Sequence, residues 1–404
     1  MVAALAHGLI DIGPLPVPAN VLLGGSGGVL LGAAALASRH RPAAYAPTSE
    51  PSPSAALLPA RRSLTRTLLR IVGALLLLAI VVPAALGPAD VAANPAPRLL
   101  FTVLWAGLLP ASLLFGPVWR ACSPLRGLAS LLAEQAPRAL PAGLGVWPAV
   151  VAAVVFSGVE QLSGQSAPLV LAFLAVYALA QLAGIAVYGP AWLAAADLFE
   201  VYSTVLGRLA PIGRDDRGRV RWRRPLVALS TTAVPPGLPA LVAVLVGAGL
   251  YDGAVLAGLP GGAMALAARM GAAASVLVAG TRPGWLAPAL LPLLAGQAAA
   301  HYLGPLLVDT QVAVVLAADP FARGWDLLGL SGAEIVDPPL PGTLALWLQL
   351  ALLVGGHVLA IVLAQRLTAA RHDARTAGAV QFSIRLVVLA SLLAAVWLRF
   401  VGPA

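Results

Sequence analysis

The sequence contains no lysine, because all 25 of its basic residues are arginine. Charge of either sign is scarce: only 10% of the 404 residues are charged, whereas about a quarter are charged in soluble proteins. This deficit argues against a soluble globular protein. The single cysteine, Cys122, excludes an internal disulfide and any CxxC motif. Hydrophobic residues make up 60% of the chain and lie in long runs, which indicates a polytopic membrane protein.

Several motifs of enzymes and nucleotide-binding proteins are also missing. Walker-type and GxGxxG loops do not occur, so ATP-driven transport by this chain alone is not supported. HExxH, Cys/His pairs at ligand spacing and the GxSxG nucleophile motif are absent too. The GGSGG run at 24–28 lacks the lysine of a phosphate loop. Because Gly24, Gly28 and Gly32 share one helix face, we interpret them as a site of close helix packing.

The hydrophobic runs predict an all-α transmembrane bundle with about ten spans, and we treat 1–404 as one integral membrane domain. The approximate spans are 21–38, 68–87, 99–118, 146–162, 169–188, 236–251, 262–280, 285–307, 343–364 and 386–400. The span at 262–280 is the weakest, because it is short, alanine-rich and interrupted by Arg269. Segment 39–66 is rich in proline, serine and alanine and predicts a flexible linker.

The arginines are distributed unevenly among the predicted loops. With the N-terminus outside, the outer segments hold only Arg98, Arg323 and Arg399, and the inner segments hold most of the others. Short cytoplasmic loops are enriched in arginine and lysine, so this orientation is the expected one. Together with the lysine-free, alanine-rich composition, typical of a high-GC bacterial genome, it predicts a bacterial cytoplasmic membrane protein. The linker 39–66 is then cytoplasmic, and the acidic loop 308–342 is extracytoplasmic.

Segment 190–224 differs from the spans. Apolar residues recur at three-to-four spacing from 190 to 211, which predicts an amphipathic helix lying on the cytoplasmic leaflet. A basic loop follows, and we expect its arginines to bind anionic lipid rather than nucleic acid. These residues are Arg217, Arg219, Arg221, Arg223 and Arg224.

The stretch 285–319 is the centre of the predicted function, because it places polar groups within a long apolar run. Ionisable residues inside a membrane are costly, so they usually face protein or a water-filled cavity. In the predicted topology, polar groups from several parts of the chain collect toward the outer leaflet. The candidate site consists of His301, Gln297, Tyr302, Asp252, Glu160, His7 and Asp309.

Imidazole and carboxylate groups together can bind a metal ion or relay a proton. A zinc or copper ion would take its ligands from His301, Asp252, Glu160 and His7. His357 lies deeper, roughly 20 Å from the outer end of its span against roughly 9 Å for His301 at about 1.5 Å per residue, so we treat it as a second point on a path. Each histidine can equally be structural and bond a neighbouring helix.

The order of motifs resembles a family of actinobacterial multi-pass membrane proteins, some of which are named fenitrothion hydrolase. The motifs are AHGLI, LFGPVWRACSPLRGL, AVYALAQLAGIAVYGPAWL, YDG, AAHYLGPLLVDTQ, DPFARGWDLLG and GHVLAIVLA. The resemblance implies an organophosphate hydrolase activity. It points to His7, Asp252, His301, Asp319, Trp325 and His357. The region between YDG and AAHYL is shorter here than in the family, which leaves the span at 262–280 uncertain.

Three functions therefore fit the sequence. The first is permease-like handling of a small solute, a proton or a metal ion, which intramembrane ionisable residues and proline-broken helices favour. The second is a membrane-embedded, metal-dependent hydrolase, which the resemblance implies. The third is a non-catalytic subunit or scaffold whose polar residues join helices. The expected partners are membrane lipid and either other membrane subunits or further copies of this chain.

Overall fold

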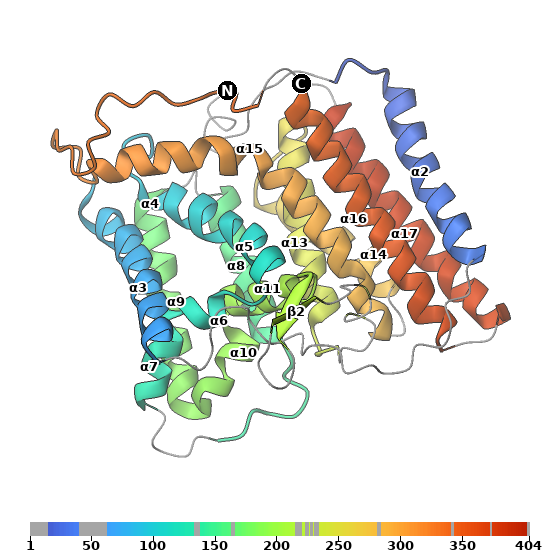
Figure 1. The fold of residues 1–404 in the computed structure, drawn as a ribbon, viewed down its shortest axis with the longest axis horizontal. Helices are drawn as coiled ribbons and strands as arrows, with labels where there is room; N and C mark the ends of the chain where they lie inside the picture. The colour runs from blue at the N-terminus through green and yellow to red at the C-terminus, as the bar shows by residue number, and fades with distance from the viewer. Residues whose placement is uncertain are drawn as a thin grey trace. The chain divides into compact units, whose positions relative to one another are not determined.

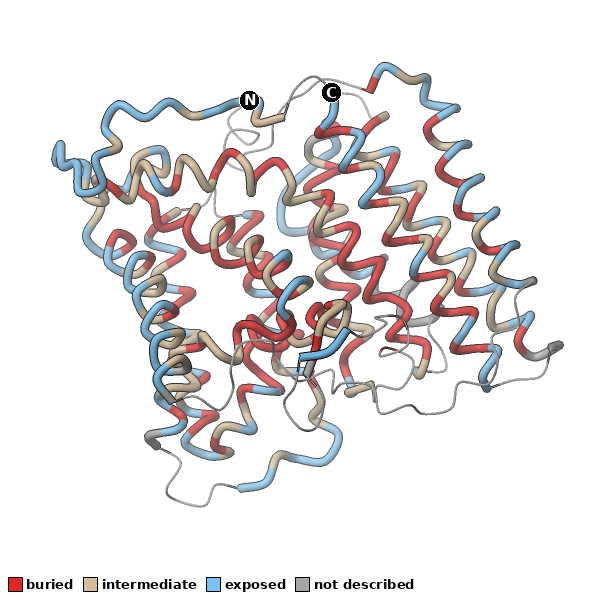
Figure 2. The backbone as a smooth tube through the Cα atoms, viewed as in Figure 1, coloured by how far each residue is buried: buried red, intermediate tan, exposed pale blue. Residues whose placement is uncertain are grey.

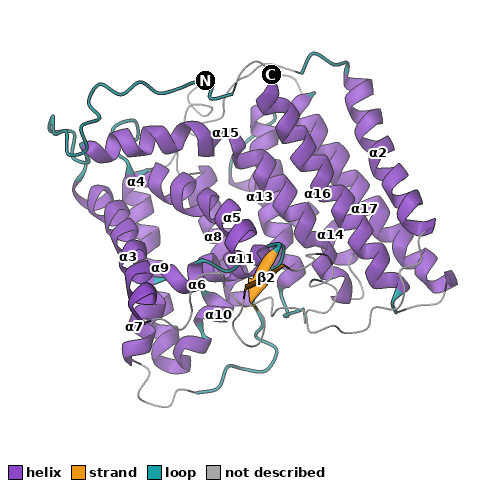
Figure 3. Ribbon diagram, in the orientation of Figure 1, coloured by secondary structure: helices purple, strands orange, loops and turns teal. Residues whose placement is uncertain are grey.

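The computed structural model describes residues 15–39, 63–132, 138–162, 166–214, 220–222, 226, 229, 234–280, 284–340, 343–371 and 374–401. Helix dominates these residues, as Figure 3 shows, and the all-α prediction is confirmed in this respect. Two short antiparallel strands, β1 (Ile212–Arg214) and β2 (Val220–Trp222), were not predicted. Of the arginines expected to bind lipid, only Arg221 lies in the described residues; it is exposed on β2.

Eight helices in the described part of the chain are long and apolar enough to cross a membrane. They cover Ala19–Ser38, Thr67–Leu86, Ala96–Phe115, Ala167–Ala191, Leu238–Val255, Gly284–Ala318, Leu344–Ala369 and Ala377–Phe400. Each contains or overlaps one of the ten predicted spans. The other two predicted spans also form helices, α8 (Trp147–Leu162) and α14 (Ala263–Gly280), but their described apolar stretches are shorter. The chain is therefore a multi-pass helical membrane protein, and ten full crossings stay a prediction.

The chain divides into two compact units, each assembled from separate segments. The first unit comprises Met1–Asp11, Ala56–Gly207 and Tyr302–Gly342. The second comprises Ile12–Ala55, Arg208–His301 and Thr343–Ala404. The long helix α15 (Leu290–Ala318) contributes its first part to the second unit and its remainder to the first.

The first unit is built on a cluster of aromatic rings. Trp105 stacks on Tyr202 with ring centroids 4.2 Å apart, and Phe156 and Phe199 pack against the same tryptophan. The helices around this cluster are α3 (Ser63–Leu86), α4 (Ala96–Arg98), the π-helix η1 (Leu99–Ala106), α5 (Gly107–Phe115), α6 (Trp119–Cys122), α7 (Pro124–Leu132), α8, α9 (Ala167–Tyr188), the 3₁₀ turn η2 (Gly189–Ala191), α10 (Leu193–Ala196) and α11 (Leu198–Gly207). Large aromatic side chains give such a core most of its buried area.

Segment 190–211 differs from the continuous amphipathic helix that we predicted. The helix breaks at Asp197, whose backbone is extended (φ −72°, ψ 105°), and α11 is buried over nearly its whole length (Figure 2). The polar residues are buried because they find partners: Asp197 accepts hydrogen bonds from Tyr177 and Trp119, and Glu200 pairs with arginine. Buried charges require such partners. Attachment of this segment to a leaflet stays a prediction.

The second unit packs α2 (Ala19–Arg39), α16 (Leu344–Ala369) and α17 (Ala374–Phe400) side by side, and α13 (Leu238–Leu256) packs against α14 and α17 (Figure 1). The turn η3 (Gly284–Ala289) and the start of α15 complete it. Glycine allows the closest approach, since a Cβ at Gly296 would lie 2.7 Å from the Cα of Gly356. The Gln365 amide also donates a hydrogen bond to the Ala34 carbonyl.

The helix that contains His301 is longer than predicted. We expected it to end at Leu307, but α15 continues to Ala318 with Pro305 inside it. Asp309 and Gln311 therefore lie within a helix and not in an acidic loop. The loop begins at Asp319, whose carboxylate accepts hydrogen bonds from the backbone N–H groups of Arg323 and Gly324.

Candidate functional site

Two residues of the predicted site form an ion pair in the second unit. The Nε2 atom of His301 on α15 lies 3.1 Å from the Oδ2 atom of Asp252 on α13. Both side chains are largely buried, with 14% of the His301 side chain and 5% of the Asp252 side chain exposed. The two helices are candidate membrane spans, so the pair lies in an otherwise apolar setting. A charged pair in such a place is costly unless it has a function or further partners.

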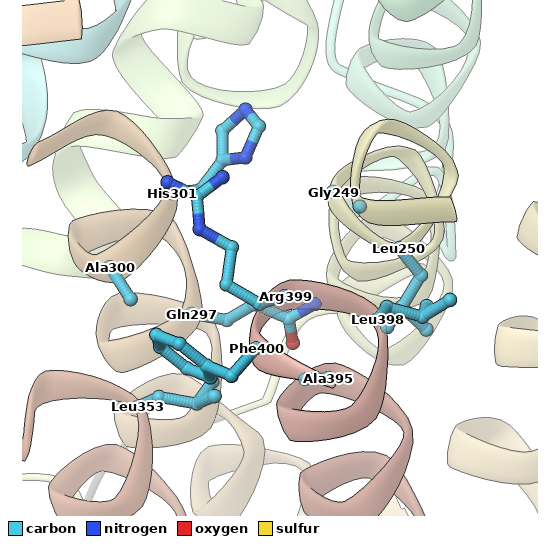
Figure 4. A pocket seen from close by; sticks show the side chains of 11 residues that line it. Gly249, Leu250, Gln297, Ala300, His301, Leu353, Ala395, Leu398, Arg399 and Phe400 are labelled. Atoms are coloured by element: carbon cyan, nitrogen blue, oxygen red, sulfur yellow. The ribbon is translucent and has the colours of Figure 1, made fainter. Parts of the chain in front are cut away.

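The pair adjoins a small cavity of about 40 Å³. Figure 4 shows that Arg399 extends from α17 toward the ring of His301, while Gln297 lies one helical turn from His301 on α15. The cavity is lined by Gly249, Leu250, Gly253, Gln297, Ala300, His301, Leu353, Ala395, Leu398, Arg399 and Phe400. Polar groups from two helices therefore line one cavity, and a carboxylate from a third helix contacts one of them.

Gln297 is the member of this set with unused hydrogen-bonding capacity. Its Nε2 atom donates a long bond of 3.4 Å to the Val246 carbonyl. Only 7% of the residue is exposed. Its Oε1 atom is buried and has no hydrogen-bond partner among the described residues. A buried amide oxygen is normally paired, so Gln297 carries an unsatisfied acceptor next to the cavity that it lines.

Arg399 gives the cavity a second positive group and lies close enough to Asp252 for their charges to interact. The sequence analysis counted Arg399 only as an outer-loop arginine and missed this role. A signal was present, because Arg399 ends a long apolar run and an arginine there must find a counter-charge or reach water. Since Asp252, Arg399 and His301 belong to three helices, only the tertiary structure shows that they converge.

Other residues of the predicted site belong to the first unit and form a separate network. Tyr302 donates a hydrogen bond to Glu160 at 3.1 Å and accepts one from the indole N–H of Trp105 at 2.9 Å. Asp309 lies 3.9 Å from the guanidinium of Arg98. Glu160, Tyr302 and Asp309 thus have protein partners of their own, which suits a structural role.

His357 is fully buried, and both ring nitrogens have partners. Nδ1 lies 2.8 Å from the Leu353 carbonyl and Nε2 lies 3.3 Å from the Ser391 hydroxyl. In a neutral ring, Nδ1–H donates to the carbonyl and Nε2 accepts from the hydroxyl. This arrangement joins α16 to α17 and fits the structural alternative for His357. His7 lies outside the described residues.

The predicted metal ligands do not assemble as a set in the described part of the chain. His301 and Asp252 are adjacent, whereas Glu160 belongs to the network of the first unit. No group of three or more His, Cys, Asp or Glu side chains in the residues that the structure describes could hold a metal ion. Zinc and copper sites normally take at least three protein ligands.

No protein-family model, curated protein or solved structure matches this chain. The resemblance to the actinobacterial family therefore stays a prediction from the motifs. What the helices show is a multi-pass helical membrane protein.

A second buried charge cluster, which the sequence did not indicate, lies in the first unit. Glu200 on α11 has 1% of its side chain exposed and receives a two-pronged hydrogen bond from Arg126. Arg120 lies 3.4 Å from the same carboxylate. Next to it, Asp197 accepts hydrogen bonds from Tyr177 at 2.7 Å, from the indole of Trp119 at 3.1 Å and from the backbone N–H of Phe199 at 3.1 Å. The three-to-four spacing of the apolar residues in this segment gave no sign of these partners.

Proposed function

We propose that this protein is permease-like and that protons pass through the cavity beside His301 as one step of transport. The observation behind this proposal is the 3.1 Å contact between His301 and Asp252 at a cavity that also holds Arg399 and Gln297. Histidine and carboxylate groups are the usual members of proton relays in membrane transporters. Histidine suits this task because it can gain and lose a proton near physiological pH.

The size of the cavity favours the proton among the solutes considered. A single water molecule needs roughly 10–15 Å³ of such space, so a cavity of about 40 Å³ admits a few waters. Water bound here would contact the His301 ring, which would link the His301–Asp252 pair to a proton route.

The charges of the site fit the same proposal. Arg399 offsets the charge of Asp252, which reduces the cost of keeping a carboxylate among membrane spans. When His301 takes up a proton, Asp252 stabilises the imidazolium; when the proton leaves, the ring is neutral and the positive charge of Arg399 still stabilises the carboxylate. His301 therefore has a suitable neighbour in both protonation states. A group that repeatedly gains and loses a proton requires this.

The proposal includes the topology inferred from the arginines. Ten spans with the N-terminus outside would place His301 and Asp252 toward the outer leaflet and the arginine-rich loops in the cytoplasm. The cavity would then exchange protons with the extracytoplasmic side. Labelling of single cysteines introduced at 90 and at 138, in a Cys122→Ser background, tests this: the first should react with an impermeant maleimide in intact cells and the second should not.

The two other functions have less support from the site. A hydrolase that activates water on a metal needs a ligand set, and the described residues offer His301 and Asp252. A scaffold would explain the hydrogen-bonded His357 but not the unpaired oxygen of Gln297. Elemental analysis of the purified protein, wild type beside His301→Ala, separates these cases, since stoichiometric metal lost in the variant would favour the hydrolase.

Proton flux into proteoliposomes tests the proposal directly. Purified protein is reconstituted with a pH-sensitive dye inside, and a potassium diffusion potential drives proton entry. We expect flux in the wild type and rates close to those of empty liposomes for His301→Gln and Asp252→Asn. His357→Gln is the matched control, because His357 is an intramembrane histidine that does not line the cavity. Wild-type flux in His301→Gln, with the fold retained, would refute the proposal.

A further inference from the structure

A second and larger cavity lies in the first unit, and none of its lining residues belongs to the proposed proton site. Its volume is about 250 Å³, and its walls come from α3, η1, α6, α7, α9 and α11. Leu77 and Val81 of α3 face Leu171, Leu174 and Ala178 of α9 across it, and Leu104 of η1 also contributes. The lining is almost entirely apolar.

We propose that this cavity binds an acyl chain of a membrane phospholipid. An apolar cavity of about 150 Å³ stays dry and accepts a molecule the size of benzene. The present cavity is larger and equally apolar, so water is a poor occupant and hydrocarbon a good one. Leaving it empty would forfeit the dispersion contacts of every side chain in its walls.

The surroundings of the cavity indicate which hydrocarbon is available. The walls on α3 and α9 belong to candidate membrane spans. The outer faces of the same helices expose large apolar side chains, which are Leu75, Leu78 and Val82 on α3 and Val176 and Leu179 on α9. Side chains of this kind face lipid in a membrane protein. The molecules beside the cavity are therefore phospholipids, present at high concentration with flexible chains.

The polar groups at one side of the cavity fit a chain rather than a headgroup. Asp197, Tyr177 and Trp119 all line it, but their polar atoms bond to one another: the carboxylate accepts from the phenol and from the indole. The phenolic oxygen also accepts from the backbone N–H of Leu198. Because these groups are already paired within the protein, a bound molecule need not supply hydrogen bonds, and an apolar chain satisfies the site.

Photocrosslinking in membranes tests the inference. The full chain is reconstituted with phosphatidylcholine that carries a diazirine in the middle of one acyl chain, irradiated and mapped by mass spectrometry. We expect Leu174 and Ala178 in the cavity to be labelled at least as strongly as Val176 and Leu179 on the outer face. Ala178→Phe should fill the cavity and abolish labelling at Leu174, whereas Leu179→Phe, the neighbouring control, should leave it unchanged.

A second measurement keeps the test decisive if Ala178→Phe does not fold. Leu77→Trp fills the same cavity from α3, and the thermal stability of delipidated protein is measured with and without added phospholipid. A ligand that binds only the folded state raises the unfolding temperature. Phospholipid should stabilise the wild type more than Leu77→Trp. Equal stabilisation, unchanged labelling of Leu174 in Ala178→Phe, or binding of free fatty acid but not phospholipid would overturn the inference.

Discussion

The Oε1 atom of Gln297 lies on the same face of α15 as His301, one helical turn away, and both side chains line one cavity. Residues four apart on a helix are neighbours, so this relationship follows from helix geometry. Its importance comes from the other helices, which bring Asp252 to the ring of His301 and leave the Gln297 oxygen without a partner among the described residues. A substitution at Gln297 should therefore affect the proposed proton flux without lowering the stability of the protein.

Gln297→Leu should lower proton flux without destabilising the protein. Leucine removes an unpaired buried oxygen, whose desolvation costs about 1–3 kcal/mol, so the unfolding temperature should stay the same or rise. Flux should fall because the cavity loses a polar amide from its lining. Gln349→Leu is the control: Gln349 on α16 also has a buried, unpartnered Oε1 atom but does not line the cavity. Equal flux in the two variants would contradict the role assigned to Gln297.

Gly296→Ala should destabilise the second unit. A Cβ at Gly296 would lie 2.6 Å from the Leu352 carbonyl oxygen and 2.7 Å from the Gly356 Cα, which is too close for either backbone atom to yield easily. Overpacking of this kind typically costs about 1–3 kcal/mol. Gly355→Ala provides the control, because a Cβ there meets nothing within 4 Å. Thermal unfolding in detergent should separate the two, and equal midpoints would show that α15 and α16 adjust freely.

Arg126→Met should strongly destabilise the first unit, because it leaves the buried carboxylate of Glu200 without its two-pronged partner. Removing one member of a buried pair typically costs about 3–5 kcal/mol. Arg120→Met should cost less, since Arg120 contacts Glu200 at 3.4 Å and 37% of its side chain is exposed. The double variant Arg126→Met with Glu200→Leu should be more stable than Arg126→Met alone. Additive losses would mean that the two residues are not coupled.

The loop after Asp319 should loosen in acid. Hydrogen bonds from the Ser331 side chain and from the backbone N–H of Leu330 lower the pKa of Asp326 below its ordinary value. A lowered folded-state pKa means that this stabilisation is present above the unfolded pKa of about 3.9 and is lost as the pH falls through the folded pKa.

Pepsin cleavage between the exposed residues Leu327 and Leu328 reports on this loop. Asp326→Asn resembles the protonated carboxyl at every pH. The variant should be cut faster than the wild type at about pH 5, and the two rates should converge toward about pH 2 as the wild-type carboxyl becomes protonated. A constant ratio of the two rates would show that ionisation of Asp326 does not hold the loop.

The sequence alone determined the class of this protein and the place of its spans. Hydrophobic runs need no partner to be recognised, because each backbone in the membrane must satisfy its hydrogen bonds within its own helix. The span Thr67–Leu86, predicted as 68–87, was therefore predictable almost to its ends. The sequence also singled out His301, since an ionisable group in such a run is unusual.

Only the tertiary structure decided which polar groups meet. The pairing of His301 with Asp252, the convergence of Arg399 on the same cavity and the burial of Glu200 between two arginines all depend on helix packing. Helical spacing shows which residues share a face but not what that face contacts, so it did not reveal the partners of Glu200. The free energy of a charge in a low-dielectric interior depends mainly on its nearest partners. Those partners come from distant parts of the chain.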